Sequence, residues 1–239
     1  MSFQSSQETQ KNKMTKDEIS RKVADMVRYI LFADRKKVGI KRPDLVKHVM
    51  KEHSRSYAKI FEEASKQINE IFGFDIVPMQ SDDGKQKGYT LVNKLHNHST
   101  FICQYTGVTD EKSNMGLLMI MLSMIFMNEY TLNDVSLWHT LKKFGIHKDK
   151  SHRYFGDVDK LIQDFVKKSY LEKTKIQGPE GPTYQYHFGA RTKKEISIRQ
   201  ILEFVTEIYG ADSIESWKIQ YREVLESERD ANVEMSQND

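Results

Sequence analysis

The feature that most constrains the fold of this chain is an order of elements that occurs twice. In the first copy, apolar residues recur at the spacing of three amphipathic helices, at residues 19–31, 43–50 and 60–72. Gly73 follows the third helix and is suited to a left-handed helix cap. Two extended segments, 74–79 and 88–95, then flank a Ser-Asp-Asp-Gly turn and predict a β-hairpin. Three helices followed by a two-stranded wing is the order of a winged-helix module.

The second copy repeats this order after a polar stretch. Helical spacing predicts three helices, at residues 115–127, 131–144 and 157–168. Segments 170–176 and 183–188 flank a turn rich in Gly and Pro, and the second of them alternates aromatic with polar residues as a half-buried strand does. Two more amphipathic helices are expected at residues 198–208 and 214–224.

The predicted fold class is therefore α+β and mainly helical, with tandem winged-helix modules and C-terminal helices. The chain divides into parts at its changes of composition. These are a disordered tail at 1–18, a first module at 19–95, a linker at 96–114, a second module at 115–210, a C-terminal helix at 211–230 and a frayed tail at 231–239.

Composition narrows the class of protein. Hydrophobic residues make up 38% of the chain, which is enough to build folded cores. The single cysteine excludes an internal disulfide framework and fits the nucleus or the cytosol. The longest uncharged apolar run, residues 115–128, is shorter than the roughly 20 residues that span a bilayer. It predicts a buried helix, and no membrane association is expected.

The sequence lacks the motifs of the common enzyme classes. There is no glycine-rich phosphate loop, no GxGxxG after a strand, no GxSxG elbow and no HExxH helix. His96 and His98 lie in the polar linker without further ligands nearby, so a solvated linker is favoured over a metal site. Cys103 is interpreted as a plain thiol rather than a nucleophile. We therefore predict a binding protein with no catalytic, cofactor-binding or metal-binding residues.

Charge differs between the two modules and along the second. The exposed positions of the first module's third helix are mixed in sign, whereas residues 142–194 hold 13 Lys or Arg against 6 Asp or Glu, an excess of +7. Seven lysines around the third helix and wing are candidate contacts to double-stranded DNA: Lys160, Lys167, Lys168, Lys173, Lys175, Lys193 and Lys194. The alternative is a solvated basic face diluted by nearby aspartates. Because no Arg is placed for bidentate contact to guanine, little sequence preference is expected.

The first helix contains a run of four large apolar residues, Tyr29, Ile30, Leu31 and Phe32. A helix normally buries one stripe, so one face cannot bury all four. Some of them pack on another element or on a partner protein. Core packing and partner binding remain open at this point.

Several segments resemble the melanoma-antigen (MAGE) homology domain in the same order. They are KVADMVRYILFADRKKVGIKRPDLVKHV from Lys22, IFEEASKQINEIFGFDI from Ile60, GYTLVNKL from Gly88, GLLMIMLSMIFMN from Gly116 and YFGDVDKLIQDFVKKSYLE from Tyr154. Short flanks and a basic wing make the chain most similar to the family's member in a chromosome-maintenance Smc complex. The family's partner-binding leucine pair falls on Ile30 and Leu31, and its Gly-Pro-Arg falls on Gly189-Ala190-Arg191.

The resemblance implies an adaptor rather than an enzyme. Such a subunit binds and stimulates a RING-type ubiquitin ligase (non-Smc element one), contacts the kleisin (non-Smc element four), binds double-stranded DNA and acts in DNA repair in the nucleus, on chromatin. Two other hypotheses are a sequence-specific winged-helix transcription factor and a chain that itself transfers ubiquitin. The second of these is disfavoured because only Cys103 could carry a thioester.

Overall fold

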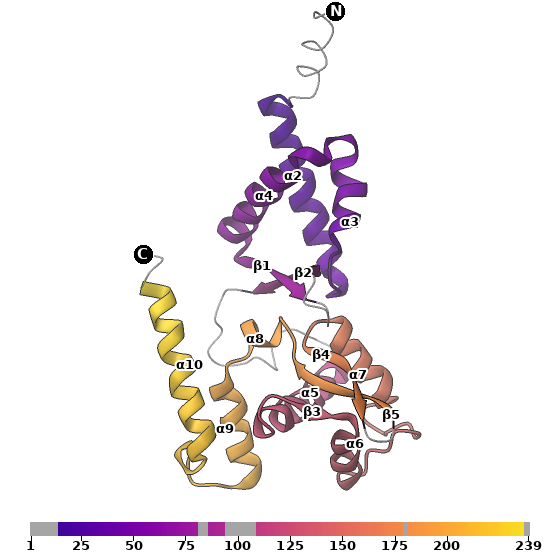
Figure 1. The fold of residues 1–239 in the computed structure, drawn as a ribbon, viewed down its shortest axis with the longest axis vertical. Helices are drawn as coiled ribbons and strands as arrows, with labels where there is room; N and C mark the ends of the chain where they lie inside the picture. The colour runs from indigo at the N-terminus through magenta and orange to yellow at the C-terminus, as the bar shows by residue number, and fades with distance from the viewer. Residues whose placement is uncertain (1–13, 81–85, 94–108, 179–180, 237–239) are drawn as a thin grey trace, which may run out of the picture. The chain divides into compact units, whose positions relative to one another are not determined.

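The computed structural model describes residues 14–80, 86–93, 109–178 and 181–236 (Figure 1). The chain forms two compact units. Unit 1 comprises Met1–Pro78 and Gln86–Leu95, and unit 2 comprises Met79–Lys85 and His96–Asp239. Each unit has its own buried apolar cluster. None of the described helices is long and apolar enough to cross a membrane.

Unit 1 begins with α2 (Lys16–Ala33). The Thr15 side chain accepts a hydrogen bond from the Glu18 backbone, and the Glu18 carboxylate accepts one from the Thr15 backbone, which forms a capping box. Residues 16–18, expected in a disordered tail, are therefore helical. The buried stripe of α2, formed by Val23, Met26, Val27 and Ile30, packs against α4 (Tyr57–Phe72).

Between α2 and α4 the helical path is broken into short turns. They are η1 (Asp34–Lys36), α3 (Arg42–Leu45), the π-helical turn η2 (Val46–Met50) and the 3-10 segment η3 (Lys51–Ser56). The helix expected at 43–50 is thus only one regular turn followed by a wide turn. Pro43 stands in the first turn of α3, as the sequence indicates. Gly73 caps α4 at φ 68°, as predicted.

The wing of unit 1 is the hairpin of β1 (Phe74–Gln80) and β2 (Gln86–Asn93). Ile40 adds a single antiparallel bridge to Tyr89, with N–O distances of 2.7 and 2.8 Å in the two directions. A Cβ on Gly88 would lie 2.6 Å from the Ile40 carbonyl oxygen, so only glycine allows this approach.

Unit 2 repeats this order of elements, with a short third strand where unit 1 has the single bridge of Ile40. Its elements are α5 (Thr109–Met127), β3 (Leu132–Asn133), α6 (Asp134–Lys143), α7 (Val158–Lys167), β4 (Leu171–Gly178) and β5 (Gly181–Phe188). The sheet order is β3-β5-β4, all antiparallel, with Leu132 opposite Tyr186 and Leu171 opposite Phe188. α5 begins at 109, so residues 109–114 of the expected linker belong to a helix.

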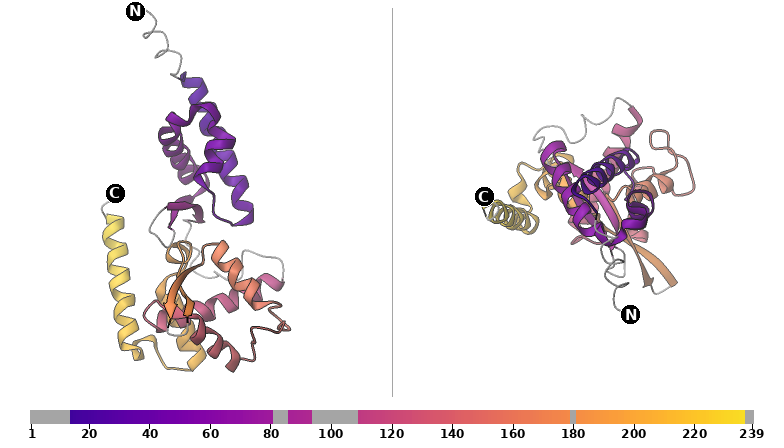
Figure 2. Two further views of the ribbon diagram at one scale, coloured as in Figure 1. Left: turned by 45° about the vertical axis from the view of Figure 1, so that its right-hand side comes forward. Right: turned by 90° about the horizontal axis from the view of Figure 1, so that it is seen from above.

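Three helices close unit 2. They are α8 (Thr192–Glu195), α9 (Ile198–Tyr209) and, after the short turn η4 (Ile214–Ser216), α10 (Lys218–Ser236). α9 and α10 run side by side in opposite directions (Figures 1 and 2). The Arg199 guanidinium binds both oxygens of Glu228, and Val224 is fully buried. α10 continues to Ser236, so residues 231–236 of the expected tail are helical.

Both units therefore follow one order: helix, strand or bridge, two helices, then two strands. This confirms the predicted α+β class of tandem winged helices with C-terminal helices. The segment between the first and second helices pairs with the second wing strand in each unit, through Ile40 in one and β3 in the other. This strand could not be predicted from the sequence, because one or two residues are too few to show alternation.

Candidate interaction surfaces

The four apolar residues at the end of α2 differ sharply in exposure. Ile30 is 1% exposed and belongs to the core of unit 1. Tyr29 and Leu31 are half-buried against that core, and the Tyr29 ring stacks on His48 with centroids 5.7 Å apart. Phe32 is 69% exposed. Of the four, only Phe32 exposes most of its side chain to solvent.

Other exposed apolar side chains stand where α2 and α4 end. The Lys37 amine lies 5.9 Å from the Phe74 ring centroid, so the segment after α2 lies beside the segment after α4. We call this region of unit 1 the α2–α4 end, and its exposed apolar residues are Phe32, Val38, Ile71 and Phe72. Isolated exposed apolar residues are common on soluble proteins, but four large ones at one end of a small unit favour partner binding.

The lysines of α7 are paired within their own helix. The Lys160 amine lies 2.9 Å from Asp157, and the Lys167 amine lies 3.0 Å from Asp164. The hydrogen bond and charge of Asp157 raise the pKa of Lys160, and the same pair lowers the pKa of Asp157. From 157 to 168 there are three lysines and three aspartates, which gives a net charge of zero. The face of α7 is therefore electrically balanced.

The remaining candidate lysines are spread along the wing and beyond it. The Lys173 amine lies 3.9 Å from the Tyr184 ring centroid, so this half-buried cation rests on an aromatic face. Lys175, opposite Tyr184, is exposed. Lys193 and Lys194 are exposed on α8, near the base of the hairpin. Lys175 lies roughly 13 Å along β4 from Leu171 at that base, at 3.3 Å per residue. Lys168, which caps α7, is half-buried.

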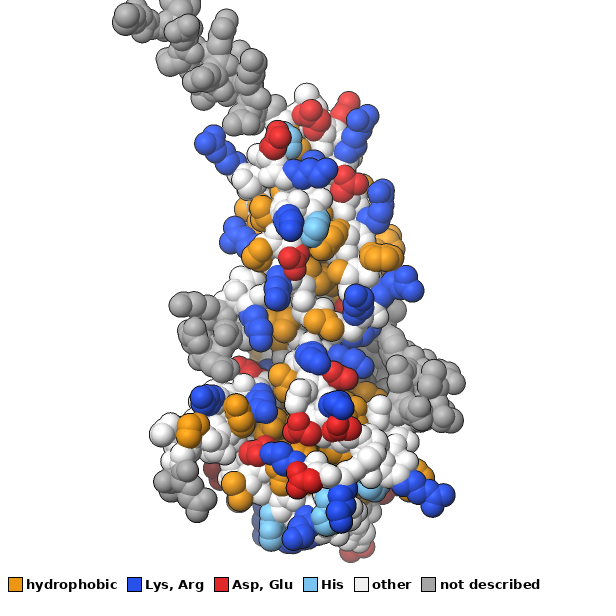
Figure 3. Space-filling model, turned by 90° about the vertical axis from the view of Figure 1, so that its right-hand side faces the viewer, with side chains coloured by type: hydrophobic (Ala, Val, Ile, Leu, Met, Phe, Trp, Pro, Cys, Tyr) orange, Lys and Arg blue, Asp and Glu red, His pale blue; other side chains and the backbone are white. Residues whose placement is uncertain are grey.

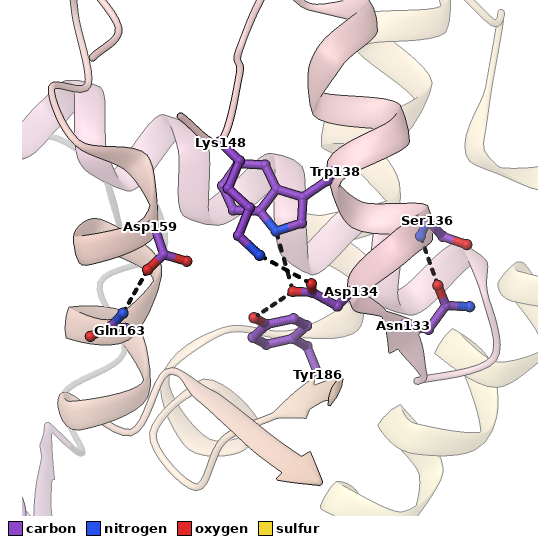
Figure 4. Close-up of polar contacts among 8 residues, drawn as sticks. All are labelled: Asn133, Asp134, Ser136, Trp138, Lys148, Asp159, Gln163 and Tyr186. Atoms are coloured by element: carbon purple, nitrogen blue, oxygen red, sulfur yellow. Dashed lines mark hydrogen bonds and ion pairs between the residues drawn. The ribbon is translucent and has the colours of Figure 1, made fainter. Parts of the chain in front are cut away.

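A carboxylate at the start of α6 connects three parts of unit 2 (Figure 4). The Asp134 side chain accepts hydrogen bonds from the Tyr186 hydroxyl at 3.1 Å and the Trp138 indole at 3.2 Å. The Lys148 amine lies 3.5 Å from the same carboxylate and 5.3 Å from the Trp138 ring centroid. Burial, and next the Asp134 charge, raise the pKa of Tyr186. The wing, α6 and the loop that follows it are thus held together.

The sequence motif Gly189-Ala190-Arg191 forms a buried turn. Arg191 is 2% exposed; its Nε donates to the Lys168 carbonyl at 2.9 Å, and its guanidinium lies 3.2 Å from Glu195. A Cβ on Gly189 would lie 2.2 Å from the Ser169 carbonyl oxygen, so glycine is required there. The turn forms with alanine at position 190, and its backbone is held by the hydrogen bond from Arg191 to the Ser169 carbonyl at 3.0 Å.

The candidate residues of the linker, His96, His98 and Cys103, lie outside the described residues. Within the described ranges, no group of three or more His, Cys, Asp or Glu side chains is arranged to hold a metal ion.

Comparison with known proteins shows the family to which the chain belongs. The model of the MAGE homology domain matches residues 26–199. The chain belongs to the MAGE homology domain family. It is 33% identical over 215 residues to the non-structural maintenance of chromosomes element 3 homolog of Mus musculus, which covers 90% of this chain and 75% of that protein. The resemblance inferred from the sequence is thereby confirmed.

Two further similarities bear on this family member. It is 34% identical over 205 residues to melanoma-associated antigen D2 of Homo sapiens, covering 85% of the chain but only 33% of that relative. The chain therefore spans about a third of the length of that antigen. A chain in a solved structure titled "Nse1-Nse3-Nse4 complex" matches with a TM-score of 0.74 and 34% identity, covering 89% of this chain and 100% of that one.

Proposed function

We propose that this chain is a non-catalytic adaptor subunit of an Smc-type chromosome-maintenance complex in the nucleus. It joins a RING-type ubiquitin ligase of the Nse1 kind to a kleisin of the Nse4 kind. The observation that carries this proposal is the match, at TM-score 0.74 and 34% identity, to a chain from a complex with both of these proteins in its title. The similarity to the mouse element 3 homolog, over three quarters of that protein, supports it independently.

We assign the ligase contact to the α2–α4 end of unit 1. The family's leucine pair falls on Ile30 and Leu31, but Ile30 is buried and fills the core. Phe32 is the exposed ring that follows this pair in the sequence, whereas Tyr29 and Leu31 are half-buried against the core. Aromatic side chains, Phe among them, are enriched in the cores of protein interfaces.

Co-purification of the chain with its ligase and kleisin partners tests this assignment. Phe32→Ala is expected to weaken ligase binding about 30-fold, the effect of a hot spot of about 2 kcal/mol. The free protein should keep its circular dichroism and its unfolding midpoint, because Phe32 is 69% exposed. Phe144→Ala, which removes a 59% exposed ring from unit 2, is the matched control. Equal ligase binding by the Phe32 and Phe144 variants would show that the α2–α4 end is not part of the interface.

We further propose that unit 2 contacts double-stranded DNA through its exposed lysines, chiefly Lys175, Lys193 and Lys194. None of the three forms an ion pair with another residue in the described part of the chain. Lys160 and Lys167 contribute less because Asp157 and Asp164 already neutralise them.

Salt dependence tests the DNA contact and separates it from the transcription-factor hypothesis. Affinity for duplex DNA should fall steeply with salt, and each of Lys175→Ala, Lys193→Ala and Lys194→Ala should reduce the slope by about 0.9. Lys160→Ala, made as a control, should change the slope less. A strongly preferred sequence in a selection experiment would favour the transcription factor and overturn non-specific binding.

A further inference from the structure

The positive charge of unit 2 is concentrated in a segment that the lysines discussed above do not include. The last turn of α6 and the loop before α7, residues 142–156, contain five Lys or Arg and one Asp, which gives a net charge of +4. The following residues 157–168 are neutral. We call residues 142–156 the α6–α7 segment. It holds most of the excess of +7 found between residues 142 and 194.

The end of this segment is a hydrogen-bonded turn rather than an extended loop. His152 and Gly156 exchange two backbone hydrogen bonds, with N–O distances of 2.7 and 2.8 Å. The Tyr154 backbone N–H donates to the His152 ring nitrogen at 3.3 Å, and Gly156 has a φ of +63°. The turn therefore displays Arg153 and Tyr154 at its tip in a fixed arrangement.

Planar side chains line this turn. The His152 ring stacks on Phe155 with centroids 4.8 Å apart, and the Tyr154 ring centroid lies 5.9 Å from that of His152. The Arg153 guanidinium lies 5.6 Å from the Tyr154 ring centroid. Tyr154 is nevertheless 66% exposed, so one part of a positioned aromatic ring is open to a ligand.

The cations of the segment differ in what they contact. Lys148 is held by Asp134 and by the Trp138 ring, and so anchors the segment to α6 and the wing. Lys142, Lys143, Lys150 and Arg153 are exposed and form no ion pair with any residue that the structure describes. In the space-filling view, Lys, Arg and His side chains gather at the lower end of unit 2 (Figure 3).

We propose that the α6–α7 segment binds single-stranded nucleic acid, with Tyr154 stacking on an unpaired base and the exposed cations contacting the flanking phosphates. A fixed exposed aromatic ring among unpaired cations is the combination that binds single strands without sequence preference. In a duplex the base faces are already stacked on one another and are not available to Tyr154. This site is separate from the proposed duplex contact of the wing and α8 lysines. Either site can exist without the other.

Fluorescence anisotropy of the full chain with labelled oligo(dT) of about 16 nucleotides tests the site. Tyr154→Ala is expected to weaken binding about 5- to 150-fold, the range for loss of one stacked base. Tyr154→Phe should bind as the unaltered chain does, because it keeps the ring. Tyr209→Ala, which removes a 74% exposed tyrosine from α9, is the matched control and should have no effect.

The cations are tested in the same assay. Lys150→Ala and Lys143→Ala should each reduce the salt slope for oligo(dT) by about 0.7. Binding to a duplex of the same length should change much less in Tyr154→Ala than oligo(dT) binding does. Far-ultraviolet circular dichroism reports whether the variants are folded. Tryptophan fluorescence does not serve here, because the Tyr209 ring packs on Trp217 with centroids 5.5 Å apart.

Three results would overturn the site. They are no binding of oligo(dT) by the unaltered chain, equal affinities of the Tyr154→Ala and Tyr209→Ala variants, or loss of a protein partner from Tyr154→Ala with nucleic-acid binding unchanged. The last result would identify the segment as a protein-docking surface. A chain that binds oligo(dT) through Tyr154 but neither ligase nor kleisin would sink the proposed adaptor function and leave this site standing.

Discussion

Replacing Arg191 with alanine tests how the wing of unit 2 is attached to the helices that follow it. Its guanidinium is 2% exposed, donates to the Lys168 carbonyl, pairs with Glu195 and lies 5.5 Å from the Tyr170 ring centroid. Removing one partner of a buried ion pair destabilises a protein by roughly 3 to 5 kcal/mol. The Glu195 side chain is 13% exposed, so water partly solvates it once Arg191 is removed. We therefore expect the free energy of unfolding to fall by about 3 kcal/mol, at the low end of that range.

Urea unfolding followed by tryptophan fluorescence measures this loss in the right part of the chain, because both tryptophans belong to unit 2. With a slope of about 2 kcal/mol per molar urea, the midpoint should fall by about 1.5 M. Lys193→Ala, which removes an exposed cation from the neighbouring helix α8, should leave the midpoint nearly unchanged. A midpoint for the Arg191 variant within about 0.3 M of the Lys193 variant would refute the argument.

Three further predictions follow from buried groups. Because burial raises the pKa of the Tyr186 phenol, the folded state binds its proton more tightly than the unfolded state. Stability should therefore fall as the pH rises above about 10, and Tyr186→Phe should reduce that fall in urea titrations between pH 9 and about 11. Ile30→Ala should destabilise unit 1 by about 3 kcal/mol, measured by far-ultraviolet circular dichroism, whereas a loss under about 1 kcal/mol would contradict its place in the core. Gly88→Ala should lower the melting temperature by displacing Ile40 from the wing, and an unchanged melting temperature would show that the bridge is dispensable.

Periodicity in the sequence was sufficient to predict the long helices and both wings. Apolar stripes at 3.6-residue spacing place α2, α4, α7 and α9 within a few residues of their ends, because burial of one face is what stabilises them. Periodicity could not predict β3 or α8, which have only two and four residues. β3 is positioned by its pairing with β5, and α8 by hydrogen bonds to the Ser169–Tyr170 turn. These are interactions between residues distant in the sequence.

The candidate surfaces were predictable in kind but not in detail. The apolar run 29–32 indicated a surface, yet only the structure shows that Ile30 faces the core and Phe32 faces solvent. Likewise, the number of lysines indicated a basic face on α7. The structure shows that Lys160 and Lys167 of this helix form ion pairs with Asp157 and Asp164. The charge of the α6–α7 segment was countable from the sequence, but its fixed turn and exposed Tyr154 were not.

The most direct test of the adaptor proposal is recovery of the tagged chain from cells of its own source, followed by mass spectrometry of what accompanies it. We expect a RING-type ubiquitin ligase and a kleisin in comparable amounts, and we expect Phe32→Ala to reduce recovery of the ligase but not of the kleisin. Recovery of the folded chain without either protein, or equal ligase recovery from the Phe32→Ala and unaltered chains, would contradict it.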